Sequence, residues 1–226
     1  MSVVLLAGGS SERLGRDKAF VEIAGREILE RVLSAAAEIS DVVIVGGDVE
    51  ALEDALARYA TVSAKGDGHY RCAQRDLRLL SDESAGLGPL EGMRVGLGAC
   101  AGPTWVVSCD LPFVVPAIAV ALSSAFDAAV AAGHAADVVV PRIGGRRQSL
   151  CAMYDTSIAE LAAEALARGE RSVHGLLEGL AVVELDEAAF APIGPPEMLF
   201  FNLNTAADAA RAHELAQRQA RRTEEP

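Results

Sequence analysis

The residues with the clearest capacity for chemistry lie near the N-terminus, where a short apolar run ends in a glycine-rich, basic loop. Gly8 and Gly9 come first, and Arg13 and Lys18 follow. Glycines let the backbone approach a phosphate closely, and successive N–H groups in such a turn form an anion site. The chain has only two lysines, Lys18 and Lys65, and takes nearly all its other positive charge from arginine. A lysine in this loop therefore suggests a role that needs the compact charge of an ammonium group. The loop predicts a site for a nucleoside triphosphate; the alternative is an ordinary turn with solvated charges.

A second candidate is Asp110, which comes just after the apolar run Trp105–Ser108. A carboxylate at the end of a buried strand points into a crevice, where leaving it unpaired is costly. Mg²⁺ removes that cost, since it takes one or two carboxylates together with phosphate oxygens of a substrate. We therefore expect Asp110 to bind Mg²⁺. The alternative is an aspartate that caps the turn before Pro112.

A third polar segment follows the apolar run Leu77–Leu80. Asp82 can accept hydrogen bonds from the N1–H and the 2-amino group of guanine, a pattern that cytosine does not present. Because an unpaired carboxylate is expensive, this contact predicts selectivity for guanine. Glu83 offers the same carboxylate chemistry, so the residues alone leave both assignments open, and a surface position for Asp82 in a polar turn is the structural alternative. The Gly-Pro-Leu sequence at 88–90 predicts the start of a helix.

A pair of asparagines, Asn202 and Asn204, lies near the C-terminus. Strand alternation would place both side chains on one face, where two amides could complete a metal or phosphate site. For Asn204 alone, capping of the following helix is an equally good explanation. That helix begins with Thr205-x-x-Asp208, which is the pattern of a capping box.

The charge balance limits the classes of partner. The 226 residues carry a net charge of −12, which argues against general binding to nucleic acids or membranes. Positive charge is concentrated in the N-terminal loop and at Arg142, Arg146 and Arg147, which either bind the phosphate of a substrate or only solvate a loop. The four cysteines form no Cys-x-x-Cys pair and the first apolar run is too short for a signal peptide, so a cytoplasmic protein is expected.

Apolar, β-branched runs alternate with alanine-rich helical patterns, which predicts an α/β fold with a parallel sheet covered on both faces. The predicted strands are Val3–Leu6, Val42–Val45, Leu77–Leu80, Trp105–Ser108, Val138–Pro141, Ser149–Tyr154, Val182–Leu185 and Leu199–Phe201. The predicted helices are Glu27–Ile39, Glu50–Tyr59, Leu90–Cys100, Pro116–Ala132, Ser157–Ala167, Ser172–Glu178 and Ala206–Arg221. Lys65–Arg75 is interpreted as a surface loop. Residues 1–221 are expected to form one domain, and residues 222–226 a disordered tail. Ligands of such sheets bind beyond the carboxyl ends of the strands, so the loops after the first, third and fourth strands should meet at the site.

Residues 6–18 resemble the LAGGxSxRMGxDK signature of the MobA-like nucleotidyltransferases, and within that family the guanylyltransferases of the molybdenum cofactor. Three further segments support the resemblance: the GPL sequence at 88–90, the CDxP-like segment with Asp110, and the FxNxNTPEEL-like ending with Asn202 and Asn204. Two departures are alanines at 206–207 in place of Pro-Glu, and Gly-Gly-Asp at 46–48 where relatives place an asparagine near the base.

The resemblance implies a Rossmann-like three-layer α/β/α fold with a mostly parallel sheet. It implies transfer of GMP from GTP to the terminal phosphate of molybdopterin, with Mg²⁺ as cofactor, release of pyrophosphate, and transient contacts with proteins that deliver or accept the cofactor. The implied catalytic residues are Lys18, Arg13 and Asp110, and the implied metal ligands are Asp110, Asn202 and Asn204. The implied nucleotide-binding positions are Leu6, Ala7, Gly8, Gly9, Lys18, Asp82, Gly88, Pro89, Leu90 and Asp110.

Two rival functions stay open at this point. A related enzyme would use CTP or another phosphorylated acceptor, because the N-terminal signature fixes neither the base nor the acceptor. A catalytically inactive adaptor on the same fold would bind GTP without releasing pyrophosphate. The joint presence of Lys18, Asp110 and both asparagines argues against the adaptor.

Overall fold

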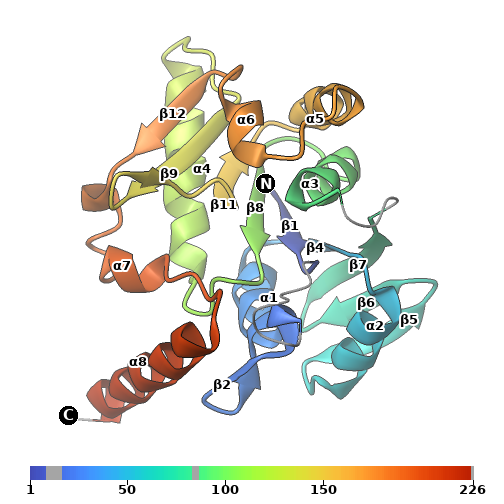
Figure 1. The fold of residues 1–226 in the computed structure, drawn as a ribbon, viewed down its shortest axis with the longest axis vertical. Coiled ribbons are helices and arrows are strands. Elements are labelled where there is room, and N and C mark those ends of the chain that lie inside the picture. Colours follow the sequence, from blue (N-terminus) through green and yellow to red (C-terminus); the bar gives the residue numbers. More distant parts are fainter. Residues whose placement is uncertain (9–16, 83–86, 225–226) are drawn as a thin grey trace.

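The computed structural model of the chain describes residues 1–8, 17–82 and 87–224, with side chains up to residue 219. The described part is built on one large sheet in the order β10-β9-β11-β8-β1-β4-β7-β6-β5, with β12 paired to β9 (Figure 1). Its strands are β1 (Ser2–Leu6), β4 (Val42–Gly46), β5 (Val62–Gly66), β6 (His69–Cys72), β7 (Arg75–Ser81), β8 (Thr104–Ser108), β9 (Val138–Ile143), β10 (Arg146–Arg147), β11 (Cys151–Tyr154) and β12 (Val182–Leu185). A separate hairpin consists of β2 (Glu22–Ile23) and β3 (Arg26–Glu27).

The centre of the sheet is parallel. Strands β8, β1, β4 and β7 run side by side in one direction, and β11 and β6 flank them in the opposite direction. Within β1, Val3 and Leu5 face one hydrophobic core while Val4 and Leu6 face another, and all four side chains are buried. A strand buried on both faces is apolar throughout, which is why these runs predicted a covered sheet.

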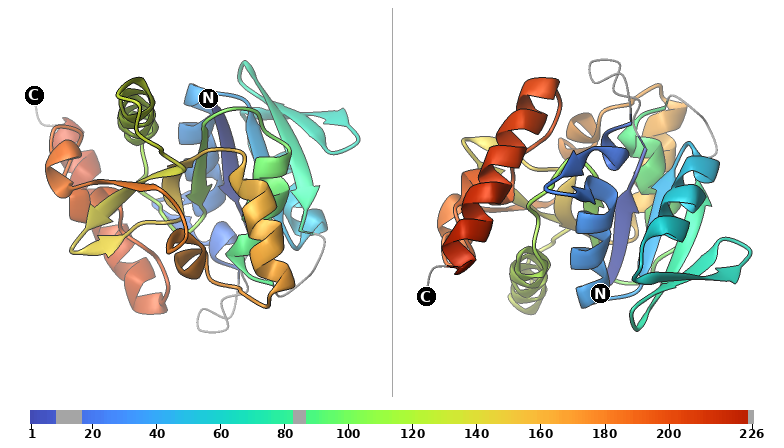
Figure 2. Two further views of the ribbon diagram at one scale, coloured as in Figure 1. Left: turned by 90° about the horizontal axis from the view of Figure 1, so that it is seen from above. Right: turned by 90° about the horizontal axis from the view of Figure 1, so that it is seen from below.

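Helices cover both faces of the sheet (Figure 2). One face carries α1 (Ile28–Ile39), α2 (Val49–Arg58) and α4 (Pro116–Ala131), and the other carries α3 (Pro89–Gly98), α5 (Ile158–Ala167) and α6 (Val173–Leu177). The remaining helical elements are the turn η1 (Lys18–Phe20), the turn η2 (Glu187–Ala189), α7 (Pro196–Leu199) and α8 (Ala206–Glu224). The three-layer α/β/α fold expected from the sequence is confirmed.

Helix α3 packs closely on the sheet because its inner face carries glycines. A Cβ atom at Gly96 would lie 2.4 Å from Val4 Cγ1, and one at Gly92 would lie 3.1 Å from Leu6 Cδ2. Both distances are shorter than ordinary contact, so larger side chains would push the helix away. The glycines therefore hold the start of α3 near the end of β1.

The segment predicted as a surface loop, Lys65–Arg75, instead belongs to a hairpin that extends the sheet. Strand β5 pairs antiparallel with β6, and β6 pairs antiparallel with β7. The turn at 66–68 has positive φ at each residue, and glycine at two of the three positions makes this conformation accessible. In β6 only Tyr70 and Cys72 are buried, so the alternation was too short to distinguish a strand from a loop.

The strand predicted at Leu199–Phe201 is wrong. Pro196 occupies the first turn of α7, which ends at Leu199, and residues 200–205 contain no strand. Proline suits the first turn of a helix, where its missing N–H has no partner to lose. The apolar run that suggested a strand is buried, with Leu199 at the end of α7 and Phe200 and Phe201 directly after the helix.

The last helix is longer than predicted. Helix α8 extends to Glu224, so residues 222–224 of the expected tail are helical, and residues 225–226 lie outside the described part. The division into one domain over residues 1–221 stays a prediction. Among the helices described, none combines the length and the apolar character that a membrane crossing requires.

Candidate active site

Strands β1, β7 and β8 run in the same direction and end at the same edge of the sheet, where ligands of such sheets bind. The Cys109 N–H donates to the Leu6 carbonyl at 3.0 Å, which joins the loop after β8 to the end of β1. The Asp82 N–H donates to the Gly46 carbonyl at 3.4 Å, which joins the loop after β7 to the end of β4. These backbone contacts hold Cys109 beside the end of β1 and Asp82 beside the end of β4, and β1 and β4 are neighbours in the sheet.

Lys18 begins the turn η1 and reaches across this edge to the C-terminal segment. The Asp17 carboxylate caps the turn by accepting the Ala19 N–H at 2.9 Å. Burial raises the pKa of Asp17, and the hydrogen bond from Ala19 opposes that rise. The Lys18 ammonium donates to Asn204 Oδ1 at 2.6 Å, and Asn204 Nδ2 donates to Asn202 Oδ1 at 2.8 Å. A charged hydrogen bond thus joins residues that are 186 positions apart.

Asp110 lies at the same edge and is tied to the same C-terminal segment, because the Leu203 N–H donates to its carbonyl oxygen at 2.8 Å. Burial raises the pKa of the Asp110 carboxyl, while the Lys18 ammonium and hydrogen bonds from the Ser108 and Asn202 side chains lower it. Its Oδ1 is buried and has no hydrogen-bond partner among the described residues. Such an oxygen is costly to bury, and a bound cation would satisfy it.

The two asparagines come together, although not for the predicted reason. Residues 200–205 form no strand, so strand alternation does not align Asn202 with Asn204; the hydrogen bond between their side chains does. The alternative that Asn204 caps the last helix is wrong. Thr205 takes that position, since its Oγ1 accepts the Asp208 N–H at 3.1 Å. The Asn204 side chain is therefore free of helix capping and serves Lys18.

The oxygen donors at this edge fit a hard divalent cation. Asp110 supplies a carboxylate oxygen that needs a partner, and Asn202 and Asn204 supply amide oxygens. An amide oxygen has two lone pairs, so each can keep its present hydrogen bond and still face a cation. In the described part no group of three or more His, Cys, Asp and Glu could hold a metal. A cation here would therefore take most of its ligands from water and a bound substrate, as Mg²⁺ commonly does.

Asp82 lies against the glycines at the ends of β1 and β4. A Cβ atom at Gly47 would lie 3.2 Å from Asp82 Oδ1, and one at Gly8 would lie 3.8 Å from Asp82 Oδ2. The Oδ1 atom is buried and has no hydrogen-bond partner within the described ranges. Burial raises the pKa of Asp82, and the nearby charge of Glu91 raises it further. The carboxylate is thus held beside bare backbone with one oxygen unsatisfied.

The Gly-Pro-Leu sequence forms the start of α3, as predicted. Gly88 precedes the helix with φ of +77°, Pro89 is its first residue, and Leu90 is fully buried. A Cβ atom at Gly88 would lie 3.6 Å from the carbonyl oxygen of Arg171, so the connection between α5 and α6 borders this helix start. Contact of these residues with a nucleotide stays a prediction.

Other sequence-predicted residues divide into two groups. Leu6 and Ala7 are buried at the end of β1, so they can offer a ligand only their backbone groups. Gly9 and Arg13 lie outside the described residues, and so does Glu83, the rival of Asp82. The roles assigned to these residues stay predictions.

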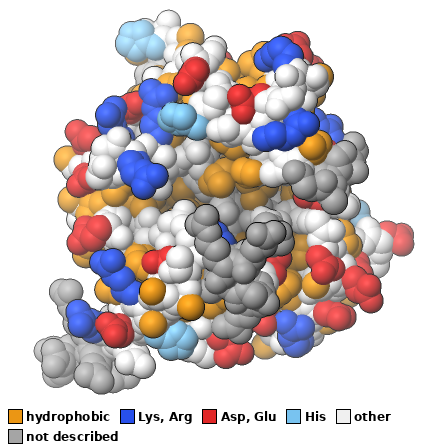
Figure 3. Space-filling view, in the orientation of Figure 1, with side chains coloured by type: hydrophobic (Ala, Val, Ile, Leu, Met, Phe, Trp, Pro, Cys, Tyr) orange, Lys and Arg blue, Asp and Glu red, His pale blue; other side chains and the backbone are white. Residues whose placement is uncertain are grey.

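A cavity of about 640 Å³ is lined by basic side chains at the β9–β10 hairpin. Glu184 accepts hydrogen bonds from Arg142 at 2.8 Å and from Arg147 at 2.6 Å. Arg146 forms no ion pair with any described residue, and His174 at the start of α6 also lines the cavity. Figure 3 shows basic side chains and a histidine gathered over this part of the molecule. The sequence did not reveal Glu184 and His174, because neither lies in a recognisable motif.

The wall of the arginine-lined cavity is linked through the backbone to the end of β8. Ser149 lines it, and the next residue, Leu150, accepts the Ser108 N–H at 3.0 Å through its carbonyl. Ser108 is the last residue of β8, and Asp110 follows two positions later.

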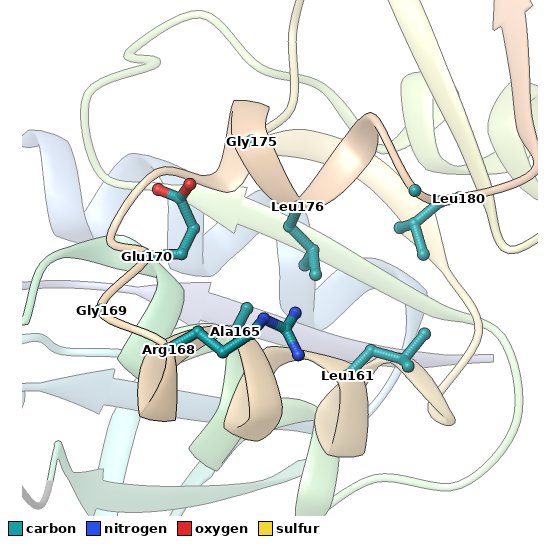
Figure 4. Close-up of a pocket in the computed structure, with 9 residues that line it drawn as sticks. Leu161, Ala165, Arg168, Gly169, Glu170, Gly175, Leu176 and Leu180 are labelled. Carbon is teal, nitrogen blue, oxygen red and sulfur yellow. The ribbon is translucent and has the colours of Figure 1, made fainter.

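A second cavity, of about 560 Å³, lies between α5 and α6. In Figure 4 the Arg168 side chain extends along this cavity, whereas Glu170 points toward α6. Glu170 accepts the Ser172 N–H at 2.6 Å and the Arg171 N–H at 2.8 Å, and these bonds lower its pKa. Glu170 thus shapes the turn between the helices.

Comparisons with known proteins agree with this geometry. Residues 3–182 match the model of the MobA-like NTP transferase domain. A probable molybdenum cofactor guanylyltransferase from Pelotomaculum thermopropionicum is 31% identical over 215 residues, which are 95% of this chain and 92% of the relative. The molybdenum cofactor guanylyltransferase of Cereibacter sphaeroides is 33% identical over 222 residues, 96% of this chain and 97% of the relative. The crystal structure of molybdopterin-guanine dinucleotide biosynthesis protein A from Archaeoglobus fulgidus superposes with a TM-score of 0.77 and 26% identity, covering 96% of this chain and 100% of that one. The chain belongs to the MobA-like NTP transferase family of nucleotidyltransferases.

Proposed function

We propose that this protein transfers GMP from GTP to the terminal phosphate of molybdopterin and releases pyrophosphate. The observation that carries the proposal is the convergence of Lys18, Asn204, Asn202 and Asp110 at the carboxyl ends of the central strands. An ammonium beside a carboxylate that lacks a partner suits a triphosphate with its cation. The names of the relatives, which are molybdenum cofactor guanylyltransferases, support the choice of donor and acceptor. We place the reaction in the cytoplasm, with transient contacts to proteins that deliver or accept the cofactor.

Asp82 supports guanine as the base. Its buried Oδ1 has no partner within the described residues, and guanine presents two N–H donors side by side. The bare backbone at Gly8 and Gly47 leaves room next to the carboxylate. Cytosine would leave this carboxylate unpaired at the cost of a lost charged hydrogen bond, about 1.5–3 kcal/mol.

Mg²⁺ fits the oxygen donors of the site. Asp110 would hold it directly, with Asn202 and Asn204 as further oxygen donors. When bound, Mg²⁺ neutralises phosphate charge and polarises the phosphoryl group for attack. Lys18 would place a second positive charge on the same triphosphate, at a position set by Asn204.

The reaction needs no covalent intermediate on the protein, because the attacking group is already a phosphate. An oxygen of the acceptor's terminal phosphate forms a bond to the α-phosphorus of GTP. The bond from that phosphorus to the oxygen leading to the β-phosphate breaks, and pyrophosphate leaves with the electron pair. Lys18 and the loop residue Arg13 would neutralise charge on the triphosphate as the bonds change. Catalysis then consists of positioning and charge neutralisation.

The arginine-lined cavity would receive the acceptor. Arg146 offers a guanidinium without an ion-pair partner among the described residues, and His174 lies on the same wall. Arg142 and Arg147 are already neutralised in part by Glu184, which fixes their orientation. A planar guanidinium matches a phosphate with two parallel hydrogen bonds, so Arg146 is suited to bind the acceptor's phosphate.

A pyrophosphate-release assay tests the proposal. The protein is given GTP, CTP or ATP with Mg²⁺, with and without molybdopterin, and nucleotide binding is followed in parallel by thermal shift. We expect stabilisation by GTP and release of pyrophosphate only when GTP and molybdopterin are both present. Turnover with CTP in place of GTP would support the cytidylyltransferase instead. Binding of GTP without any release would support the inactive adaptor.

A further inference from the structure

Asp208, in the first turn of α8, accepts more hydrogen bonds than helix capping requires. Its Oδ2 accepts the Thr205 N–H at 2.8 Å and the Thr205 hydroxyl at 2.9 Å, and Thr205 Oγ1 accepts the Asp208 N–H in return. These contacts are the capping box that the sequence predicted. The same Oδ2 also accepts the Asn204 N–H at 3.0 Å. Asn204 precedes the capping residue, so this additional bond lies outside the box.

Other capping aspartates make simpler contacts. Among the described residues, Asp17, Asp48 and Asp186 each accept a single backbone N–H to cap their turn or helix, at 2.9, 3.0 and 3.0 Å. Asp208 differs because a single oxygen of its carboxylate gathers both backbone N–H groups that precede the helix. Its position therefore sets the backbone of Asn204 as well as the start of α8.

The side chain of Asn204 transmits this restraint to the site. Its Oδ1 accepts the Lys18 ammonium at 2.6 Å, and its Nδ2 donates to Asn202 Oδ1 at 2.8 Å. A planar amide that is engaged at both ends can hold its partners in place only if its own backbone is fixed. Asp208 supplies that fixed point.

We propose that Asp208 is a positioning residue that sets the place of the Lys18 ammonium through Asn204. The contact runs from the Asp208 carboxylate to the Asn204 N–H, and from the Asn204 amide to Lys18. The significance for catalysis rests on the proposed function, in which Lys18 acts on the triphosphate. The structural link itself does not depend on that function and can be tested without substrates.

Amine labelling of the protein without substrates tests the link. Because the chain has only two lysines, Lys65 on the β5–β6 hairpin is an internal reference for Lys18. The protein is treated briefly with an amine-reactive ester and cut at glutamate, and the labelled fractions of both lysines are measured by mass spectrometry. Loss of the restraint on Lys18 in Asp208→Ala should raise the Lys18-to-Lys65 labelling ratio about three- to tenfold. An unchanged ratio in folded Asp208→Ala overturns the proposal.

Three further variants separate positioning from helix capping. Asn204→Ala should raise the ratio as much as Asp208→Ala, and the double variant should match Asn204→Ala, because both changes remove the same link. Thr205→Ala removes the capping hydroxyl but leaves both backbone bonds to Asp208, so its ratio should stay at the wild-type value. An increase in Thr205→Ala equal to that in Asp208→Ala would mean that capping alone explains the effect and would overturn the proposal. So would a double variant whose increase is the product of the two single increases.

Asp155→Ala is the control for the loss, elsewhere in the chain, of a carboxylate that accepts a backbone N–H. Asp155 accepts the Ser157 N–H at 2.9 Å before α5, and we expect no change in the Lys18 ratio. If Asp208→Ala fails to fold, Asp208→Asn takes its place. The asparagine keeps an oxygen that accepts hydrogen bonds more weakly, so the increase in the Lys18-to-Lys65 labelling ratio should be smaller. A wild-type ratio in both folded Asp208→Asn and Asn204→Ala would overturn the link. The pyrophosphate assay is a separate readout. A raised labelling ratio with unchanged kcat would refute the catalytic role of Lys18 and leave the link to Asp208 standing.

Discussion

Replacing Asp110 with asparagine should stabilise the substrate-free protein and abolish transfer. The two side chains have nearly the same shape, but the amide carries no charge to desolvate. In the wild type, Oδ1 of Asp110 is buried without a partner among the described residues, and burial raises the pKa of this carboxyl. An unsatisfied buried group costs about 1–3 kcal/mol. Lys18 and the Ser108 and Asn202 side chains favour the charged carboxylate and offset part of that cost. We therefore expect a net gain of about 1 kcal/mol, or roughly 2–4 °C in Tm for a domain of this size.

The assay combines thermal unfolding with turnover. For the wild type, GTP with Mg²⁺ should raise Tm, since a ligand that binds only the folded state stabilises it. In Asp110→Asn the substrate-free Tm should be higher, the further rise that Mg²⁺ adds to GTP should be lost, and pyrophosphate release should fall to background. Asp155→Asn is the control: its carboxylate already accepts the Ser157 N–H, so the change should lower Tm slightly and leave turnover intact.

Two results would refute this reasoning independently. Turnover at the wild-type rate in Asp110→Asn would show that the Asp110 carboxylate is not required for transfer. A Tm lower than that of the wild type would mean that the carboxylate is satisfied in the folded protein, so that no destabilised group awaits the cation. A substitution that raises Tm and abolishes turnover is expected at a residue whose charged form destabilises the folded protein but is needed for the reaction.

Four further substitutions test other parts of the molecule. Asp82→Ala should lower kcat/KM for GTP about 10- to 100-fold without lowering that for CTP, which a comparison of both nucleotides measures; equal losses for both would refute base recognition. Gly96→Ala should cost about 1–3 kcal/mol in urea unfolding because its Cβ would lie 2.4 Å from Val4 Cγ1. Gly98→Ala on the same helix, with no atom within 4 Å of its Cβ, should instead be neutral or stabilising by up to about 1 kcal/mol. Arg146→Ala should raise KM for molybdopterin about tenfold and leave KM for GTP unchanged. A raised KM for GTP with an unchanged KM for molybdopterin would mean that the acceptor does not bind in the arginine-lined cavity.

Strands β1, β4 and β8 at the centre of the sheet could be predicted because they are buried on both faces and are therefore apolar almost throughout. The same logic failed at the edges. In β6 only Tyr70 and Cys72 are buried, and glycines interrupt the hairpin, so its sequence resembles a polar loop. At Leu199–Phe201 the apolar run was real, but Pro196 before it favoured a helix turn, and tertiary packing buried the aromatic residues without a strand.

In the site, too, the features set by neighbouring residues could be predicted, whereas contacts between residues far apart in the sequence could not. That Lys18 and Asp110 share one edge follows from the position of their loops after parallel strands, which the sequence reveals. The hydrogen bond from Lys18 to Asn204 spans 186 positions, and no local pattern specifies it. The pairing of Glu184 with Arg142 likewise depends on β12 lying parallel to β9, a neighbour relation that the order of elements did not indicate.

The selectivity proposed for this enzyme can be understood from two buried carboxylate oxygens. Asp82 and Asp110 each keep a buried oxygen without a partner in the described structure, after strands β7 and β8, which are separated by β1 and β4 in the sheet. The two oxygens need different partners, since Asp82 lies beside bare backbone where a base could donate hydrogen bonds, whereas Asp110 lies beside amide oxygens and an ammonium where phosphates and a cation fit. A guanosine without phosphates would satisfy only the first, and CTP with Mg²⁺ only the second. GTP with Mg²⁺ would satisfy both, and we propose that discrimination arises because the two carboxylates stay unpaired until the correct nucleotide binds.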